Sequence, residues 1–311
     1  MDIWNEFKKT VGISPVNIDQ LNRVALKTPT AKPNKSIKSN LEIEITPEYL
    51  DILKWLKAKA PIVFVTGKAG TGKTTLIHYL RENYQGNVVV VAPTGVAALN
   101  VGGSTIHSFF RFPPRVVSDD DIKLVRDRNL YRKLNLLIID EISMVRAEVV
   151  DAIDQFLQLN REIHEPFGGV QLLMVGDLFQ LSPVNPRRES DVLKSMGYES
   201  PYFFSAKVFK RCSMAFRELT KTYRQSQEEF ISVLNQVRVA ESIDHVLPCL
   251  NRRHLSCEET NDAIITLACT NRVADSINDR ELKKLSSPMH TFIGEVSGKF
   301  ALEDEKLPSP L

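Results

Sequence analysis

Short runs of consecutive apolar residues recur along the middle of the chain, and stretches with helical spacing separate them. The runs are IVFV (62–65), NVVVVA (87–92), LLII (136–139) and QLLMV (171–175). Each run is short and rich in branched side chains, which is typical of strands that are buried on both faces. Because strands that alternate with helices form parallel sheets, the pattern predicts an α/β fold with helices on both faces of a parallel sheet.

End signals delimit two of the predicted helices. Residues 45–56 are predicted to form a helix with Thr46 as the N-cap and Pro47 at the first helical position. Residues 146–165 carry a second helical pattern, which the PFGG segment at 166–169 ends. The apolar stripe of the first helix is predicted to consist of Leu50, Ile52, Leu53 and Leu56.

The two ends of the chain have a different character. Residues 1–44 are interpreted as an extension and linker, because TPTAKPNKSIKSN (28–40) is polar, interrupted by proline and rich in lysine. We favour a solvated linker here over a basic arm that binds nucleic acid. Residues 215–311 are interpreted as an incomplete second α/β unit, with an edge strand and loop at 216–224, helices at 228–239 and 272–285, and a buried strand at 263–271.

Composition and charge change this picture little. The chain is 43% hydrophobic and 25% charged, which is ordinary for a soluble globular protein. A net charge of +2 permits a nucleic-acid partner only through a local basic patch. Cys249, His254 and Cys257 fit no common zinc spacing, so the cysteines are interpreted as reduced thiols. With no secretory signal pattern and no membrane-length apolar run, we expect a cytoplasmic protein, or a nuclear one in a eukaryote.

The segment GKAGTGKT (67–74) matches the phosphate-binding loop G-x-x-x-x-G-K-[ST]. It follows the apolar run at 62–65 and precedes a helical pattern at 76–80, which is the context that this loop requires. Glycines let the backbone N–H groups approach phosphate, Lys73 supplies a positive charge, and the Thr74 hydroxyl can bind Mg²⁺. The residues expected to bind the nucleotide are Gly67, Gly70, Thr71, Gly72, Lys73, Thr74 and Thr75.

Two further apolar runs end in polar residues that suit this chemistry. The run at 136–139 ends in Asp140 and Glu141, which can bind Mg²⁺ and activate water respectively. After the run at 171–175, Gly176 and Asp177 turn the chain, and Gln180 presents an amide that can contact a γ-phosphate. A plain strand followed by a helix cap explains this last segment equally well.

The segment GGSTIHSFFRFPP (102–114) mixes small polar residues with aromatic rings. Polar groups that contact phosphates and rings that stack on bases are combined in grooves for single-stranded nucleic acid. The alternative is a loop whose phenylalanines belong to the core. The composition alone favours this second interpretation.

Taken together, these segments resemble the PIF-type (petite integration frequency) helicases, superfamily-one motors related to RecD that move 5′-to-3′ on DNA. The resemblance spans residues 45–285 and is carried by GKAGTGKTT (67–75), APTGVAALNVGGSTIHSFF (92–110), IIDEISMV (138–145), PFGGVQLLMVGDLFQLSPV (166–184), LTKTYRQ (219–225) and TNRVADSIN (270–278). It implies a RecA-like ATPase domain 1A at 45–214, with a small wedge insertion (domain 1B) at about 111–133. Residues 215–311 would form part of a second RecA-like domain, 2A.

The resemblance also implies catalytic roles at matching positions. Lys73 and Thr74 would hold ATP and, together with Asp140, its Mg²⁺ ion. Glu141 would activate the attacking water.

Gln180 would couple the γ-phosphate to domain motion, and Arg224 would be an arginine finger from the second domain. The track for single-stranded DNA would be lined by Thr94, Thr105, His107 and Phe109.

The chain departs from the family pattern in two places. No glutamine near Tyr49 takes the adenine-reading position, and the family's later DNA-contacting and arginine blocks do not occur before Leu311, so the chain resembles a truncated member. The expected function is an ATP-dependent helicase of repair, recombination or telomere maintenance, acting as a monomer on single-stranded and 5′-tailed duplex DNA and not on a membrane. The alternative is an ATP- and DNA-binding module that does not unwind.

Overall fold

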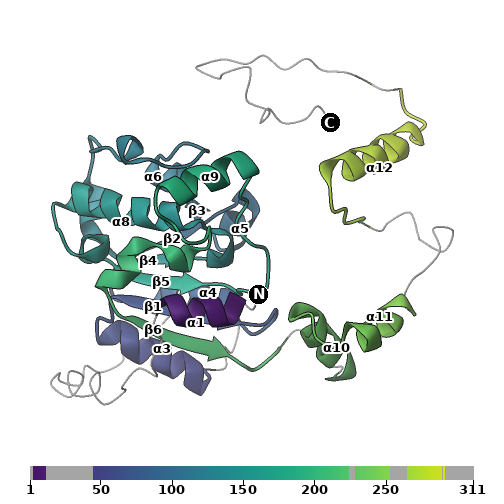
Figure 1. Cartoon of the computed structure of the whole chain (residues 1–311), viewed down its shortest axis with the longest axis horizontal. Coiled ribbons are helices and arrows are strands. Elements are labelled where there is room, and N and C mark those ends of the chain that lie inside the picture. The colour runs from purple at the N-terminus through teal and green to yellow at the C-terminus, as the bar shows by residue number, and fades with distance from the viewer. Residues whose placement is uncertain (1–2, 12–44, 224–227, 253–264, 289, 291–311) are drawn as a thin grey trace. The chain divides into compact units, whose positions relative to one another are not determined.

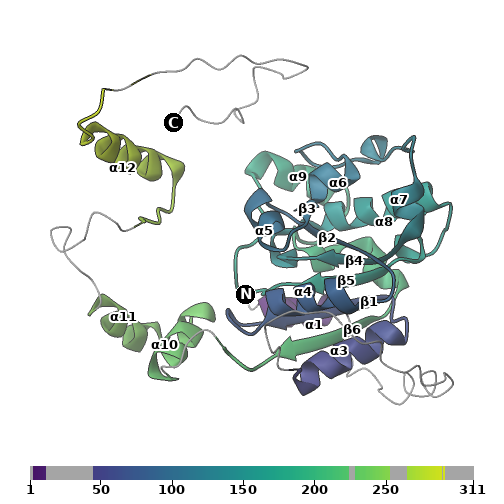
Figure 2. The ribbon, with the colours of Figure 1, turned by 180° about the vertical axis from the view of Figure 1, so that it is seen from behind.

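A six-stranded parallel sheet in the order β3-β2-β4-β5-β1-β6 forms the centre of the fold (Figures 1 and 2). The computed structural model describes residues 3–11, 45–223, 228–252, 265–288 and 290. The strands are β1 (Ile62–Gly67), β2 (Asn87–Ala92), β3 (Ser104–Thr105), β4 (Leu134–Ile139), β5 (Gln171–Val175) and β6 (Met214–Leu219). Every pairing between neighbouring strands is parallel. The predicted fold class is confirmed, and each of the four apolar runs forms a strand.

Helices connect the strands and cover the sheet. Those described are α1 (Ile3–Val11), α3 (Pro47–Lys57), α4 (Lys73–Asn83), α5 (Gly95–Asn100), α6 (Ile106–Phe110), α7 (Asn129–Lys133), α8 (Ala147–Arg161), α9 (Arg187–Ser195), α10 (Glu228–Arg238), α11 (Ile243–Asn251) and α12 (Asn271–Lys283). Short 3-10 turns include η2 (Ile142–Met144), η3 (Pro166–Gly169) and η4 (Phe203–Ser205). The helix predicted at 146–165 ends earlier, at Arg161, where Glu162 takes a left-handed conformation with φ 60°. The PFGG segment forms η3 and therefore does not end this helix, contrary to the prediction.

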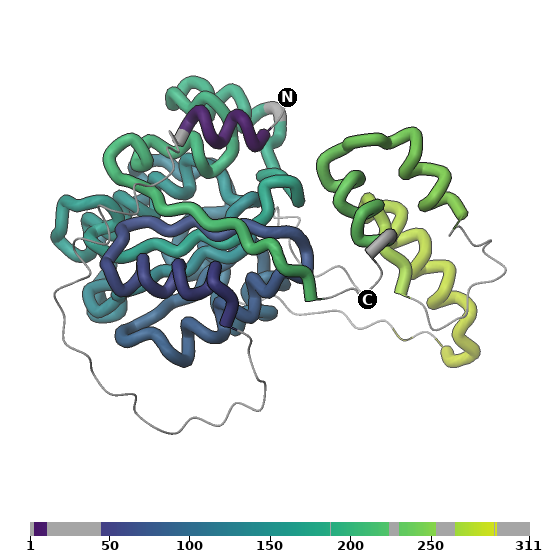
Figure 3. The backbone as a smooth tube through the Cα atoms, turned by 90° about the horizontal axis from the view of Figure 1, so that it is seen from below, coloured from purple at the N-terminus to yellow at the C-terminus, as the bar shows by residue number. Residues whose placement is uncertain are grey.

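Both faces of the sheet are buried, as the continuous apolar runs predict. In β1, Ile62 and Phe64 belong to one core cluster, whereas Val63 and Val65 belong to the other. Residues of α1 and α8 pack in the first cluster, and residues of α3 and α4 pack in the second. Figure 3 shows α1 and α3 on opposite sides of the strands.

Helix α3 begins as predicted but buries a different face. The Thr46 hydroxyl accepts a hydrogen bond from the Tyr49 N–H at 3.4 Å, and Pro47 is the first helical residue. The buried residues of α3 are Tyr49, Ile52, Trp55 and Leu56. Leu50, which was predicted to be in the stripe, is 47% exposed. Because a helix turns every 3.6 residues, the line through positions 49, 52 and 56 faces the sheet and position 50 lies off it.

Helix α1 differs from the extension that was predicted for residues 1–44. Phe7 is fully buried, and its ring centroid lies 5.2 Å from that of Phe64 in β1. The Trp4 ring lies 5.3 Å from the ring of Phe216 in β6. The apolar residues of α1 therefore pack on the sheet, whereas the lysine-rich segment at 28–40 lies outside the described residues.

The predicted insertion at 111–133 packs against α8. Val125 and Tyr131 are buried in the first core cluster. The side chain of Asn160, in α8, accepts a hydrogen bond from the Val125 N–H at 2.8 Å and donates one to the Lys123 carbonyl at 3.1 Å. The wedge role of this insertion stays a prediction.

Strand β6 extends the first sheet beyond the boundary predicted at residue 214. It pairs with β1 along its whole length, from Met214 opposite Ile62 to Leu219 opposite Gly67. The predicted edge strand is therefore an edge of the six-stranded sheet and not of a second one. Two compact units are formed, Met1–Leu250 and Asn251–Leu311.

The second unit lacks the strand predicted at 263–271 in the part that is described. Residues 265–270 have no strand conformation, and Ile265 and Leu267 are 87% and 95% exposed. A strand needs a neighbour to pair its backbone groups, and none of the described residues supplies one here. The predicted helix at 272–285 does form, as α12, but buries none of its residues.

Candidate nucleotide-binding site

The loop between β1 and α4 has the backbone shape of a phosphate cradle. Gly70 and Gly72 have φ values of 77° and 91°, in the left-handed region that glycine tolerates best. The Thr71 hydroxyl donates a hydrogen bond to the Lys68 carbonyl at 2.9 Å and closes the loop. Because α4 begins at Lys73, the unpaired N–H groups of its first turn border this loop and favour an anion.

The Lys73 ammonium group lies inside the loop. Its Nζ donates to the carbonyl oxygens of Gly67 and Lys68 at 2.6 and 3.0 Å. Burial lowers the pKa of Lys73, and the charges of Asp177, Glu141 and Asp140 act in the opposite direction. Three carboxylates from the ends of two strands are thus close enough to this ammonium group to stabilise its charge.

Asp140 and Glu141 follow directly after β4, at the carboxyl edge of the sheet. Asp140 is 7% exposed, and its N–H donates to the Val91 carbonyl of β2 at 2.9 Å. Glu141 has φ 50° and ψ 44°, so the extended backbone ends abruptly at this residue. Burial raises the pKa of both carboxyls, and the charge of Asp140 raises the pKa of Glu141 further. Both residues lie at the strand end, where the sequence predicted them.

The turn after β5 is built around Asp177, which is fully buried. Its carboxylate accepts a hydrogen bond from the Phe179 N–H at 3.1 Å, and its carbonyl accepts one from the Gln180 N–H at 3.0 Å. Gln180 itself is exposed. The sequence identified Asp177 only as a turn residue, whereas the structure shows that its charge acts on both Lys73 and Glu141.

Two tyrosines that sequence reasoning did not select contact the loop. The Tyr49 hydroxyl donates to the Gly72 carbonyl at 2.7 Å, and the Tyr223 N–H donates to the Gly70 carbonyl at 2.8 Å. Burial, and secondarily Tyr223, raises the pKa of Tyr49 to about 12. Gly72 has a φ of 91°, and a Cβ atom on it would lie 2.6 Å from the Tyr49 oxygen, so a larger residue would be strained here. Arg224, the predicted arginine finger, lies outside the described residues.

The residues predicted to line a DNA track cluster at the ends of β2 and β3. Thr94 caps α5 by accepting from the Ala97 N–H at 3.2 Å, and Thr105 caps α6 by accepting from the Ser108 N–H at 3.2 Å. His107 is half-buried in α6. Phe109 packs on the core with its ring centroid 5.4 Å from that of Tyr131. The threonines and Phe109 thus have structural contacts in addition to any role on DNA.

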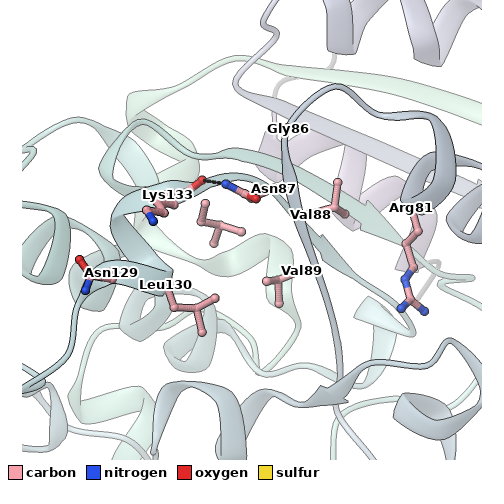
Figure 4. A pocket seen from close by; sticks show the side chains of 9 residues that line it. Arg81, Gly86, Asn87, Val88, Val89, Asn129, Leu130 and Lys133 are labelled. Carbon is pink, nitrogen blue, oxygen red and sulfur yellow. Dashed lines mark hydrogen bonds between the residues drawn. The ribbon is translucent and has the colours of Figure 1, made fainter. Parts of the chain in front are cut away.

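A separate cavity of about 550 Å³ opens at the opposite, amino-terminal edge of β2 and β4 (Figure 4). Arg81 of α4 lies on one side and Leu130 of α7 on the other. Two of its lining residues are joined by a hydrogen bond, which the Asn87 side chain donates to the Lys133 carbonyl at 2.8 Å. Open α/β sheets bind ligands at the carboxyl ends of their strands, and this cavity lies at the other edge of the sheet.

A parallel sheet with a phosphate-binding loop after β1 and carboxylates after β4 defines a P-loop nucleotide-binding domain of the RecA-like class. The chain belongs to the PIF1-like helicase family, whose model matches residues 49–246. It is 34% identical over 292 residues to the ATP-dependent DNA helicase PIF1 of Saccharomyces cerevisiae strain YJM789, covering 90% of this chain and 32% of that protein. It is also 34% identical over 245 residues to the human protein of that name, covering 75% of this chain and 36% of that protein. The chain therefore spans about a third of the length of these relatives.

Solved structures show the same likeness. The structure of Bacteroides Pif1 helicase in complex with ADP-AlF3 and single-stranded DNA is 40% identical, with a TM-score of 0.71 over 79% of this chain and 59% of that one. The Candida albicans Pif1 helicase is 32% identical, with a TM-score of 0.64 over 78% of this chain and 55% of that one. None of the described helices has the length and apolar character needed to cross a bilayer.

Proposed function

We propose that this chain hydrolyses ATP with Mg²⁺ and uses the energy to move 5′-to-3′ on single-stranded DNA, separating 5′-tailed duplexes. The observation that carries this proposal is the convergence of Lys73, Asp140 and Glu141 at one edge of the sheet, where the two carboxylates stabilise the charge of the ammonium group. Similarity to helicases that are bound to an ATP analogue and to single-stranded DNA supports it. Such a motor would serve DNA repair, recombination or telomere maintenance.

Mg²⁺ fits the donor set at this edge. Asp140 is a buried carboxylate whose pKa is raised by burial, so a cation beside it would offset the cost of its charge. Oxygen donors of the carboxylate and hydroxyl type are those that Mg²⁺ prefers, and Thr74 lies in the first turn of α4. We assign Asp140 and Thr74 to the ion, which would neutralise phosphate charge when bound.

The remaining roles follow from the chemistry of each side chain. Phosphate oxygens would replace the loop carbonyls as partners of the Lys73 ammonium group, which now bonds Gly67 and Lys68. Glu141 has a raised pKa, which brings it nearer to the range in which a carboxylate takes a proton from water effectively. Gln180 and Arg224 are assigned to γ-phosphate coupling and to transition-state charge.

The nucleotide-binding residues that were expected from the sequence form the loop and the first turn of α4. We assign phosphate contacts to its backbone N–H groups. The residues proposed to bind the nucleotide are Gly67, Gly70, Thr71, Gly72, Lys73, Thr74 and Thr75. Thr94, Thr105, His107 and Phe109 are proposed to contact DNA at the neighbouring strand ends.

Steady-state ATP hydrolysis with and without single-stranded DNA tests the proposal. We expect stimulation by DNA, and a loss of at least about a hundredfold in kcat for Lys73→Ala and for Glu141→Gln. Glu141→Gln should still bind Mg-ATP, because it removes a proton acceptor and not a phosphate contact. His78→Gln, in α4 but without an assigned role, is the control and should hydrolyse ATP normally. Normal turnover by the Lys73 or Glu141 variant would refute these roles.

A module that binds ATP and DNA without unwinding is the second candidate. It is favoured by residues 265–270, which are exposed and have no strand conformation, since a motor needs two domains that close on ATP. A 5′-tailed duplex with a fluorescent reporter strand decides between the two. Release of the strand with ATP supports the motor, and salt-sensitive binding without release supports the module. The chain is expected to act as a monomer; a related structure has two coordinating Pif1 helicases at forked DNA.

A further inference from the structure

Arg238, the last residue of α10, forms a two-bond ion pair with Asp177 in the turn after β5. Its Nε donates to Asp177 Oδ2 at 2.8 Å, and its Nη2 donates to Oδ1 at 2.6 Å. The guanidinium carbon lies 4.4 Å from the centroid of the Phe179 ring. This parallel fork, stacked on an aromatic face, is a geometry that arginine can adopt and lysine cannot.

The pair is withdrawn from solvent. The side chain of Asp177 is 1% exposed and that of Arg238 is 16% exposed. Two charges that are removed from water gain little net stability compared with apolar residues of the same size. The buried pair is therefore expected to hold a particular segment in place. That segment is the turn that carries Phe179 and Gln180.

That turn belongs to the nucleotide site. Strand β5 pairs in parallel with both β1 and β4, so the turn after β5 lies between the loop that follows β1 and the carboxylates that follow β4. The Gly176 N–H at the start of the turn donates to the Val65 carbonyl of β1 at 3.1 Å. In addition, a cleft of about 400 Å³ lies between Lys68 of the loop and residues of α10, including Arg238. Helix α10 thus contacts the site at the β5 turn and borders it at the loop.

We propose that Arg238 is a positioning residue that fixes the Asp177–Gln180 turn against α10 and transmits nucleotide binding to that helix. This inference rests on the proposed ATPase function. A phosphate near Gln180 shifts the turn, and the turn moves α10 because the fork ties Asp177 to the end of the helix. Arg238 itself makes no contact with the reacting atoms; it acts through Asp177.

A second pair between a buried aspartate and an arginine provides a control; in this pair the arginine side chain is 50% exposed. The Asp154 carboxylate accepts a hydrogen bond from the Phe167 N–H at 2.6 Å and pairs with Arg211. Asp177 likewise accepts from the Phe179 N–H, but it pairs with Arg238 through two hydrogen bonds, whereas Asp154 pairs with Arg211 through one. The two pairs differ in position: Asp154 holds the η3 turn that precedes β5, whereas Asp177 lies in the turn that follows β5, at the opposite end of the strand.

The kinetic test compares Arg238→Lys and Arg238→Gln with Arg211→Gln in the 311-residue chain. We expect kcat for ATP to fall about tenfold or more in both Arg238 variants, while KM changes less than about threefold. Arg211→Gln should keep the wild-type kcat. Because lysine retains the charge, a loss in Arg238→Lys would show that the fork geometry matters. Values of kcat in both Arg238 variants within about twofold of the control would overturn the proposal.

Hydrogen–deuterium exchange separates this inference from the proposed function, because it needs no hydrolysis. In the wild type, Mg²⁺ with the analogue AMP-PNP should change exchange in the loop at 67–74 and in α10. In Arg238→Gln the loop should still respond and α10 should not. An equal response of α10 in both proteins would overturn the inference.

If AMP-PNP does not change exchange in the loop at 67–74 of the wild type, the proposed function fails. The inference about Arg238 can still be tested by comparing exchange in the proteins without nucleotide. Without nucleotide, Arg238→Gln is expected to raise exchange in α10 by about tenfold or more over the wild type and over Arg211→Gln, because the helix loses its tie to the turn. Equal exchange in α10 of all three proteins would show that Arg238 does not hold α10 in place.

Discussion

Two apolar runs with similar composition end in opposite environments in this protein. The run IVFV in β1 is completely buried between β5 and β6. The run that includes Ile265 and Leu267 is strand-like in sequence, yet these side chains are 87% and 95% exposed. Both runs have the residue types that favour strands, but among the described residues only the first has neighbours that pair with its backbone. An apolar run thus encodes a tendency, and the partners decide whether a strand forms.

The largest change in the free energy of unfolding is expected for a substitution in the buried run of β1. Phe64→Ala removes a fully buried ring that packs against Phe7 and Phe203. Loss of a buried aromatic side chain and the resulting cavity should lower the free energy of unfolding by about 3–5 kcal/mol. Urea denaturation monitored by circular dichroism measures it. A loss below about 1 kcal/mol would mean that the aromatic cluster relaxes around the cavity.

A smaller change in stability, in this case an increase, is expected when Asp140 at the edge of the same sheet is replaced. Burial raises the pKa of Asp140 in the folded protein, so its charged form is disfavoured there. A raised folded pKa contributes stability that is present below the unfolded value and is lost as the pH rises through the folded value. Asp140→Asn should therefore be more stable than the wild type at pH 7.5, by a margin that shrinks towards pH 5, although it should lose hydrolysis.

Melting temperatures of both proteins between pH 5 and 7.5, without Mg²⁺ or nucleotide, measure this margin. His78→Gln is again a suitable control, because it changes a residue of α4 outside the site. A variant that is less stable than the wild type at every pH would show that hydrogen bonds outweigh the burial of the Asp140 charge.

The smallest change in the free energy of unfolding is expected for a substitution in the exposed run at 265–270. Leu267→Ala changes a side chain that is 95% exposed, so the free energy of unfolding should change by less than about 0.5 kcal/mol. The same denaturation experiment as for Phe64→Ala applies. A loss comparable to that of Phe64→Ala would show that this run is buried in solution and would remove the contrast between the two regions.

The sequence predicted the elements whose signals are local. The loop at 67–74 was recognisable from its glycines and from the strand and helix around it. The carboxylates after the run at 136–139 lie at the strand end, as expected. The cap at Thr46 was recognisable too, because the residues that specify a helix start are adjacent in the chain.

Features that depend on distant contacts were missed. Helix α1 was assigned to an extension because the polar, lysine-rich segment at 28–40 decided the interpretation of residues 1–44. The rings that cover Phe7 come from other parts of the chain. The Tyr49 bond to Gly72 joins residues on either side of β1. Arg238 had no local signal, since Asp177 precedes it by 61 positions.

Sequence by itself determined the α/β class, the order of most strands and helices along the chain, and the residue types for phosphate and Mg²⁺ chemistry. These follow from hydrophobic periodicity and from short motifs, in which the residues concerned are neighbours. Only the tertiary structure decided that β6 completes the first sheet, that residues 265–270 are not a strand, and that Arg238 meets Asp177. Strand pairing and buried ion pairs depend on which segments the folded chain brings together, and that is a property of the whole fold.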